Sequence, residues 1–190
     1  MRKDDKVRAA ILRAAETLFQ KWGIKKTAME DIAREAGKGK STLYYYFKSK
    51  EEILEAVALA QASRITEKAK EEIAKKNTAK EKLLVYAYST FKETRESITL
   101  YDIARGEIRA YKDLIQDVLQ KYDAIEKEIL ESILRFGIER KEFKSIGPAD
   151  VAASARAIVI IKRSLAINLF VDNDDRELID LVIKLLSEGL

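Results

Sequence analysis

The chain of 190 residues contains no cysteine and no histidine, and it has only one proline and seven glycines. Without cysteine it can form no disulfide, no thiolate metal site and no thiol nucleophile. Without histidine it has no imidazole base, no Ser-His-Asp triad and no Glu-x-x-His di-iron cage. Zinc sites almost always use cysteine or histidine, so a zinc site is excluded as well. Most enzyme chemistries therefore lose a principal group.

Long apolar runs are also missing from the sequence. The longest, such as residues 83–88 and 157–161, fall far short of the ~20 residues that span a bilayer. The first residues, Met1–Lys6, lead into an acid-containing amphipathic stretch and not into an apolar signal core. We therefore expect no membrane segment and a cytoplasmic location.

No cofactor or metal is expected either. The acidic run Asp172–Asp175 invites comparison with a calcium loop, but it lacks the loop glycine and the distal glutamate of an EF-hand. Acids at this point favour a helix N-terminus, where negative charge is stabilising.

The scarcity of helix breakers, beside abundant Ala, Leu, Ile, Glu and Lys, predicts an all-α fold. Apolar residues recur at helical spacing and no strand pattern appears. About nine helices are predicted, over residues 5–21, 27–36, 40–47, 50–76, 78–94, 98–108, 112–136, 148–170 and 174–188. The first three form an N-terminal head, residues 1–50, and a long fourth helix joins the head to a helical body, residues 51–190.

The net charge of +4 is unevenly distributed between the head and the body. Residues 1–50 carry 13 Lys/Arg and six Asp/Glu, a net charge of +7, whereas the remainder carries −3. A basic head on a mildly acidic body indicates a polyanionic partner at the head. A solvated surface with a chance asymmetry would give the same numbers, so charge alone leaves both interpretations open.

Three small or apolar residues in the head have the spacing of a helix-turn-helix. Ala33 supplies a small side chain where two steeply crossed helices approach, and Gly37 supplies a residue that tolerates positive φ in the turn. Leu43 and Phe47, four residues apart, anchor the second helix to the head. Thr27–Glu30 has the form of a capping box at the start of the first of these helices. The pattern predicts a motif whose second helix enters the major groove of DNA.

The head resembles a known family at this point. The stretch Thr27–Gly37, followed by Ser41–Glu52, is similar to the N-terminal signature of tetracycline-repressor-like (TetR family) regulators. The resemblance is strong over residues 7–55; beyond them only the general layout agrees, together with the segment Gly137–Phe143 at the end of a long helix. It implies a homodimer, a palindromic double-stranded DNA operator, and a pocket in the body for a small-molecule effector that weakens DNA binding.

Two residues depart from the family pattern. Lys38 stands in the turn where relatives usually have an apolar residue, and Gly39 stands where they usually have the Ser or Thr that caps the recognition helix. Glycine is a tolerable N-cap, so we expect the helix to form. Lys38 either adds a phosphate contact or leaves the turn slightly looser.

The resemblance also implies which residues contact DNA. Lys40, Ser41 and Tyr44 match positions that face bases, with Thr42, Tyr45 and Tyr46 in base or phosphate roles and Thr27 and Lys50 on phosphates at either side of the groove. An aromatic core cluster is the alternative for residues 44–47, and we accept it for Phe47 and Leu43. Three successive tyrosines cannot all face inward on a helix, because neighbours are ~100° apart. We therefore favour DNA contact for Tyr44 and Tyr45.

The C-terminal helices predict a second chain. The segment Ala157–Ile161 is apolar on every side of its helix, and such a helix must be buried all round. In a body this small the outer face needs a partner, unless the burial occurs wholly within one chain. The expected dimer residues are Ile160, Ile161, Leu178, Val182, Ile183 and Leu186.

The effector pocket is predicted only coarsely. Polar-tipped or aromatic candidates in the body are Tyr86, Phe91, Tyr101, Arg105, Tyr111, Phe136 and Asn168. Residues 78–190 carry a net charge of about −2, which offers no strong attraction for a highly anionic molecule. We expect an apolar or amphipathic effector that is neutral or cationic.

Two rival functions are weighed against a DNA-binding repressor. A helical protein–protein adaptor would explain the bundle but not the basic head with Thr42–Phe47. A carboxylate-metal enzyme would need several inward acids on facing helices, whereas the acids fall mainly on polar stripes. The sequence therefore favours a transcriptional regulator and not an enzyme.

Overall fold

The structure, a computed structural model, describes residues 3–96, 112–169, 181 and 184. Over these residues every regular element is helical, which confirms the all-α prediction. The elements are α1 (Lys3–Trp22), α2 (Met29–Glu35), α3 (Lys40–Tyr46), α4 (Lys50–Ala74), α5 (Ala79–Glu96), α7 (Lys112–Glu139), the 3-10 turn η2 (Pro148–Asp150) and α8 (Val151–Leu169). The helices expected over 98–108 and 174–188 lie outside this set, apart from residues 181 and 184.

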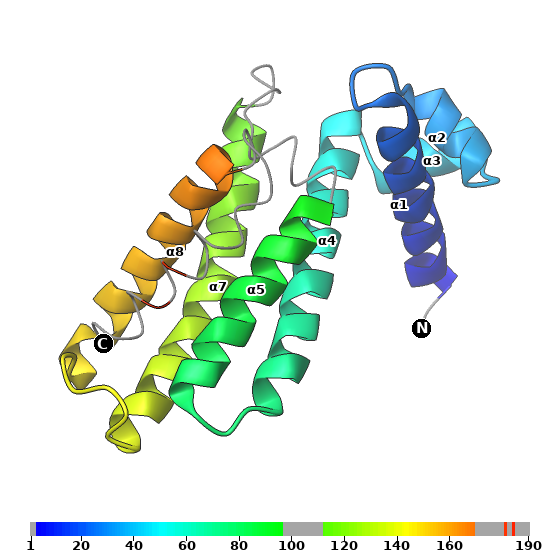
Figure 1. Cartoon of the computed structure of the whole chain (residues 1–190). Helices are drawn as coiled ribbons and strands as arrows, with labels where there is room; N and C mark the ends of the chain where they lie inside the picture. Colours follow the sequence, from blue (N-terminus) through cyan, green and yellow to red (C-terminus); the bar gives the residue numbers. More distant parts are fainter. Residues whose placement is uncertain (1–2, 97–111, 170–180, 182–183, 185–190) are drawn as a thin grey trace.

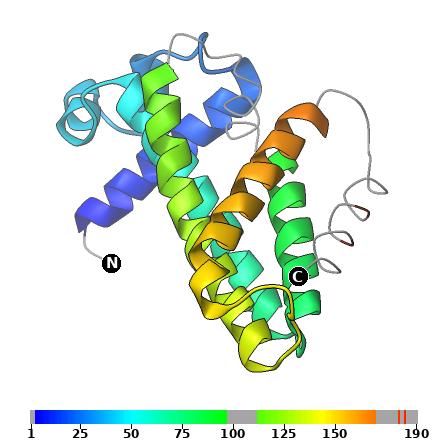
Figure 2. The same cartoon turned by 90° about the vertical axis from the view of Figure 1, so that its left-hand side faces the viewer.

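The head and the body occupy opposite ends of the molecule. In Figure 1, α1, α2 and α3 gather at one end, and α4 runs from them into a bundle with α5, α7 and α8. The loops that join α4 to α5 and α7 to α8 lie at the far end, as the turned view in Figure 2 also shows. Helix α4 packs on α1 in the head and on α5 and α7 in the body. It is the element that joins the two parts.

The start of α2 differs from the prediction. The helix begins at Met29 with Ala28 as its N-cap, so the capping box expected between Thr27 and Glu30 is wrong. The Thr27 hydroxyl donates to the carbonyl of Gly23 at 2.9 Å, because the loop after α1 brings that acceptor within reach. Asp31 takes over the reciprocal role, and its carboxylate accepts from the Ala28 N–H at 3.2 Å.

Helix α4 begins with a side-chain cap. The Ser49 hydroxyl accepts from the backbone N–H of Glu52 at 3.3 Å, as expected of an N-cap. The Glu52 carboxylate accepts from the N–H of Lys48 at 2.7 Å and not from that of Ser49. Ser49 and Glu52 therefore cap α4 together, with the reciprocal bond one residue earlier than in a capping box.

Two hydrophobic cores hold the molecule together. The head core joins α1, α2, α3 and the first half of α4, and it also contains Val118 and Tyr122 of α7. The body core joins the second half of α4 to α5, α7 and α8, and Tyr86 is its largest fully buried side chain. Because α4 and α7 contribute to both cores, apolar packing continues across the boundary expected near residue 50. An ion pair also links α7 to α4, because the Lys121 ammonium lies 2.5 Å from the Glu55 carboxylate.

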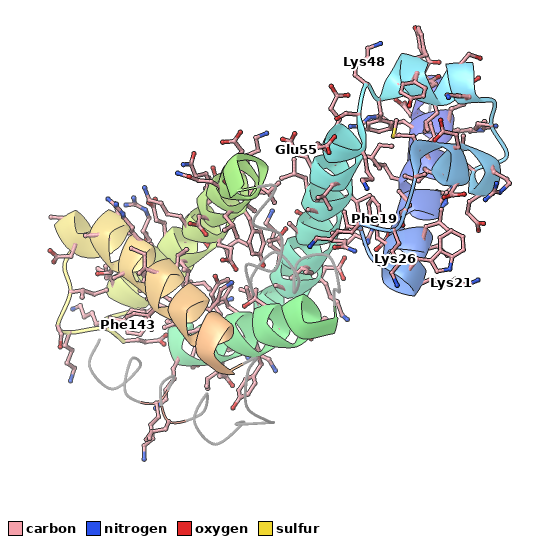
Figure 3. All side chains as sticks on the ribbon, turned by 90° about the horizontal axis from the view of Figure 1, so that it is seen from above. Phe19, Lys21, Lys26, Lys48, Glu55 and Phe143 are labelled. Atoms are coloured by element: carbon pink, nitrogen blue, oxygen red, sulfur yellow. The ribbon has the colours of Figure 1, made fainter. Side chains whose placement is uncertain are left out.

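The C-terminal end of α7 closes in a Schellman-type turn. The N–H of Glu142 donates to the carbonyl of Gly137 at 2.8 Å, and that of Lys141 donates to Ile138 at 3.0 Å. Lys141 adopts φ +58°, the left-handed conformation that such a turn requires. The chain then folds back so that Phe143, labelled in Figure 3, is buried. Its ring lies directly against Gly137. Helix α7 thus ends later than residue 136, the predicted limit.

Candidate nucleic-acid interface

The turn between α2 and α3 has the geometry that its sequence predicts. Gly37 adopts φ +61°, where a side chain would be strained. The N–H of Lys38 donates to the carbonyl of Ala33 at 2.9 Å, and that of Gly37 donates to Arg34 at 3.1 Å. Gly39 is the extended N-cap of α3 and has no side chain to cap it. Ala33 is buried at the crossing, so the two helices meet at a small residue as expected.

Helix α3 presents two tyrosines to solvent and packs two apolar residues inward. Leu43 and Phe47 are buried, whereas Tyr44 is 36% exposed and Tyr45 is 73% exposed. The sequence argument about the three tyrosines is confirmed in this respect. Lys40 and Ser41 are also exposed, and Thr42 and Lys38 are half-buried. Lys40, Ser41, Tyr44 and Tyr45 are hereafter called the α3 face.

Tyr46 is held by the head instead of facing outward. Its hydroxyl donates to a carboxylate oxygen of Asp4 on α1 at 2.7 Å. This hydrogen bond, followed by partial burial and the charge of Asp4, raises the pKa of Tyr46 to about 12. The Tyr45 ring meets the Tyr46 ring edge-on, with centroids 5.1 Å apart. Tyr46 therefore fixes α3 to α1 and supports Tyr45.

Lys40 is paired with Glu30, which the sequence placed in a capping box and not beside the DNA-contacting residues. Its ammonium lies 2.6 Å from the Glu30 carboxylate of α2 and 5.9 Å from the centre of the Tyr44 ring. The hydrogen bond and charge of Glu30 raise the pKa of Lys40, and those of Lys40 lower the pKa of Glu30. Both side chains are more than half exposed, so water weakens the pair. Only the packing of α2 beside α3 reveals it.

Thr27 and Lys50, expected on phosphates, have internal partners. Thr27 is 2% exposed and its hydroxyl donates to the carbonyl of Gly23, so its phosphate contact stays a prediction. The Lys50 ammonium donates to the carbonyls of Ile24 at 2.9 Å and of Thr27 at 3.0 Å. An ammonium has three donors, so one remains for a further acceptor. In this arrangement both residues shape the loop between α1 and α2.

Two cations beside the α3 face escaped the sequence analysis. Lys48, labelled in Figure 3, is exposed and donates to the carbonyl of Tyr44 at 3.1 Å, so it caps the C-terminal end of α3. The Arg8 guanidinium of α1 lies 5.1 Å from the centre of the Phe47 ring. Both add positive charge where α3 meets the rest of the head. The sequence analysis assigned neither side chain a DNA contact, because only the folded head shows that both lie beside α3.

The body candidates have different surroundings. Tyr86 is buried in the body core, as an internal site requires. Phe136 is half-buried, with the Lys82 ammonium 4.9 Å and the Arg140 guanidinium 5.2 Å from its ring centre. The pocket role expected of Phe136 stays a prediction. The remaining candidate side chains lie outside the described set: Phe91, Tyr101, Arg105, Tyr111 and Asn168.

The expected dimer face is partly described. Ile160 is 44% exposed and Ile161 is 38% exposed on the outer side of α8, while Val159 faces the body core. Leu178, Val182, Ile183 and Leu186 lie outside the described residues. Leu181, between them, is 51% exposed.

Neither metal-binding nor membrane-spanning features occur in the described parts of the chain. Residues 3–96 and 112–169 bring together no group of carboxylates able to hold a metal ion. No helix among the same residues has the length and apolar character to cross a bilayer.

The two short helices, the glycine turn and the exposed lysine–tyrosine face define a helix-turn-helix DNA-binding protein. A family profile, Bacterial regulatory proteins, tetR family, matches residues 11–57. The HTH-type transcriptional regulator YhgD of Bacillus subtilis is 26% identical over 159 residues, which are 83% of this chain and 80% of that protein. The helix-turn-helix head therefore belongs to the TetR family, and the chain is a transcriptional regulator and not an enzyme.

Solved structures agree over the whole fold. The transcriptional regulator FadR from Bacillus subtilis, in complex with stearoyl-CoA, superposes with a TM-score of 0.71 at 27% identity, covering 96% of this chain and 98% of that one. A TetR-family regulator from Syntrophomonas wolfei superposes with a TM-score of 0.75 at 22% identity, covering 99% and 98%. The similarity therefore extends through the body as well as the head.

Proposed function

We propose that the protein is a repressor that binds a palindromic operator as a homodimer and is released by a small molecule bound in the body. The observation that carries the DNA-binding half is the α3 face. Tyrosine hydroxyls are good phosphate donors, and lysine donates to guanine O6 and N7 in the major groove. Helix α3 presents both groups on the surface of a head with net charge +7. Such a protein works on DNA in the cytoplasm.

The dimer half of the proposal rests on α8. Ile160 and Ile161 leave apolar surface exposed on its outer side, next to exposed Ala153 and Ala157, which allow another helix to approach closely. A two-fold dimer through this surface would place two recognition helices about one helical turn of DNA apart, ~34–36 Å or a little more. Palindromic operators match that symmetry.

The effector half rests on the body. FadR of Bacillus subtilis holds stearoyl-CoA, a ligand with a long acyl chain, in a fold of the same layout. Helices α5, α7 and α8 of this protein surround a core of aliphatic and aromatic side chains. That core suits a mostly apolar ligand with a few polar anchors. We infer an amphipathic effector, neutral or cationic, because the body has no excess of positive charge.

A DNA-binding experiment tests the first half of the proposal. The wild-type protein should shift a fragment from upstream of its own gene, and Lys40→Ala/Tyr44→Ala should bind the best site far more weakly with the same helical content. Lys70→Ala is a matched control, because Lys70 is also an exposed lysine paired with an acid, Glu67, but lies on α4. If the double variant binds as well as wild type, the α3 face is not the reading surface. A helical adaptor without DNA binding would show no shift at all.

Sedimentation tests the dimer. Wild type should sediment as a dimer at micromolar concentration, and Ile160→Lys should shift it toward monomer, because an unpaired charge in an apolar interface is costly. Ser63→Lys adds the same charge at an exposed position of α4 and should leave the dimer intact. A well-folded wild-type monomer at this concentration would exclude the arrangement.

A further inference from the structure

The body contains a buried ion pair that no part of the DNA-binding site uses. Glu126 of α7 is 1% exposed, and its carboxylate contacts the ammonium of Lys162 on α8, whose side chain is 11% exposed. Charged side chains are almost never fully buried unless they are paired. Replacing such a pair with apolar residues is often neutral or stabilising, so stability alone does not account for it. A binding role is the alternative that its surroundings support.

Two tyrosine rings complete the surroundings of the Lys162 ammonium. The nitrogen lies 5.6 Å from the centre of the Tyr86 ring on α5 and 5.1 Å from that of Tyr122 on α7. An ammonium that faces two aromatic rings and a carboxylate has the environment that proteins use to recognise organic cations. Tyr86, Tyr122 and Glu126 are hereafter called the cation cage. Lys162 is its present occupant.

The charges around the cage favour a cation over an anion. Burial raises the pKa of Tyr86 well above its ordinary value, and the negative charges of Glu126 and Asp123 raise that pKa further. Two carboxylates, those of Glu126 and Asp123, thus act on this ring beside the single ammonium of Lys162. The Tyr86 hydroxyl is buried without a well-formed hydrogen bond among the described residues, and a weak interaction with the Glu126 carboxylate contributes to its raised pKa. Its oxygen can still accept an N–H from a ligand.

We propose that the cation cage binds the protonated amine of a lipophilic small molecule, which takes the place of the Lys162 ammonium. The exchange preserves charge balance at Glu126, because one cation replaces another. Lys162 has a route out, since its side chain already reaches the surface and its flexible stem can carry the ammonium into water. The inference rests on the proposed ligand-responsive function and adds to it the ligand class and the anchoring residues.

The position of the cage links it to the head. Tyr86 belongs to the body core, whereas Tyr122 belongs to the head core with α1, α3 and α4. The residue before Tyr122, Lys121, is paired with Glu55 of α4. A ligand that repositions Tyr122 therefore acts on side chains that pack against the head. Coupling between effector and operator typically changes affinity roughly 5–150-fold, and the two sites must affect each other equally.

The test compares three probes with the same alkyl chain on the full-length protein. Dodecyltrimethylammonium, dodecanol and dodecanoate, each below its micelle concentration, are titrated by calorimetry and then added to the complex with an operator selected from random DNA. We expect the cation to bind at least tenfold more tightly than the alcohol and to release the operator. The carboxylate should bind no better than the alcohol.

Variants of the cage then locate the binding. Glu126→Gln/Lys162→Met removes both charges together, so no unpaired charge remains buried; it should fold and should lose the preference for the cation while still binding dodecanol. Lys162→Met alone frees Glu126 and should tighten cation binding. Glu67→Gln/Lys70→Met removes a surface pair of the same type and should leave all three affinities unchanged.

The outcomes separate this inference from the proposed function. An undiminished cation preference in the double cage variant, or no preference in wild type, overturns the cage. Tightest binding of dodecanoate, abolished by Lys162→Met, also overturns it, because the site then takes an anion. If a neutral or acyl ligand still releases the operator in those cases, ligand-responsive repression stands without the cage. If no operator is ever selected, the proposed function itself fails.

Discussion

Replacing Gly137 with alanine tests how tightly the far end of the body is packed. A Cβ added at Gly137 would overlap ring atoms Cδ2 and Cε2 of Phe143 and lie 2.8 Å from the Cβ of Ala79. Neither neighbour can yield easily, since Phe143 is buried and Ala79 has no exposed surface. The Phe143 ring must therefore move out of its position for the variant to fold.

The magnitude follows from two opposing effects. Overpacking a core costs typically ~1–3 kcal/mol, and the overlap with Phe143 places this site at the upper end. Alanine in place of glycine in a helix interior regains about 1 kcal/mol. We expect Gly137→Ala to lower the free energy of unfolding by about 2 kcal/mol. For a chain of this length that corresponds to a decrease in Tm of roughly 4–8 °C.

A double-mutant cycle provides the assay and its control. Urea unfolding followed by circular dichroism, at one fixed protein concentration, compares Gly137→Ala in the wild type and in Phe143→Ala. Phe143→Ala alone should cost roughly 3–5 kcal/mol. With the ring gone only the approach to Ala79 remains, so Gly137→Ala should cost much less than it does in the wild type. If it destabilises both backgrounds equally, the Phe143 contact is not the cause and the reasoning is refuted.

Three further predictions concern the head. Gly37→Ala should lower the free energy of unfolding by about 1–2 kcal/mol, because position 37 needs a left-handed backbone, and Gly37→Asn should lower it less. Thermal melting of both variants measures the difference. Equal losses of stability would contradict the backbone explanation. Tyr46 should ionise near pH 12 and, in Asp4→Asn, return toward ~10, as followed by tyrosinate absorbance. Because the folded state favours the neutral phenol, the stability contributed by the Tyr46–Asp4 hydrogen bond is complete below pH ~10 and is lost as the pH rises toward 12. An unchanged titration of Tyr46 in Asp4→Asn would rule out that hydrogen bond. Glu30→Gln should free the Lys40 ammonium from its ion pair and so tighten operator binding at low salt. The slope of log K against log salt concentration should steepen by up to ~0.9. Weaker binding would show instead that Glu30 assists DNA recognition.

The sequence predicted those features of the fold that depend on local chemistry. Gly23 and Gly37 both adopt positive φ where a helix was expected to end, and Ser49 caps α4, because each of these depends on residues within one turn. The burial of Leu43 and the exposure of Tyr45 follow equally from helical periodicity. The predictions that were wrong concern side chains whose partners are set by the fold of the chain. Thr27 left the predicted cap because the folded loop placed the Gly23 carbonyl nearer to its hydroxyl.

The parts of the sites that were missed involve residues far apart in the chain. Tyr46 and Asp4 are 42 residues apart, and Glu126 and Lys162 are 36 apart. In the sequence Glu126 stands between an isoleucine and a lysine and is indistinguishable from the acids of a solvated stripe. Only the packing of α8 against α7 turns it inward. No periodicity within one helix contains that information.

The shared role of α4 in the two cores makes the head a rigid extension of the body. Its 25 residues form a rod of roughly 37 Å, and its side chains are packed along the whole length, so no joint absorbs a disturbance. A tilt of ~5° about the far end of such a rod displaces the near end by about 3 Å, close to the ~3.4 Å rise of one base pair. In a two-fold dimer the displacement is applied at both half-sites at once. A ligand that tilts α4 would then move both recognition helices out of register with the DNA, because the spacing of the major grooves is fixed.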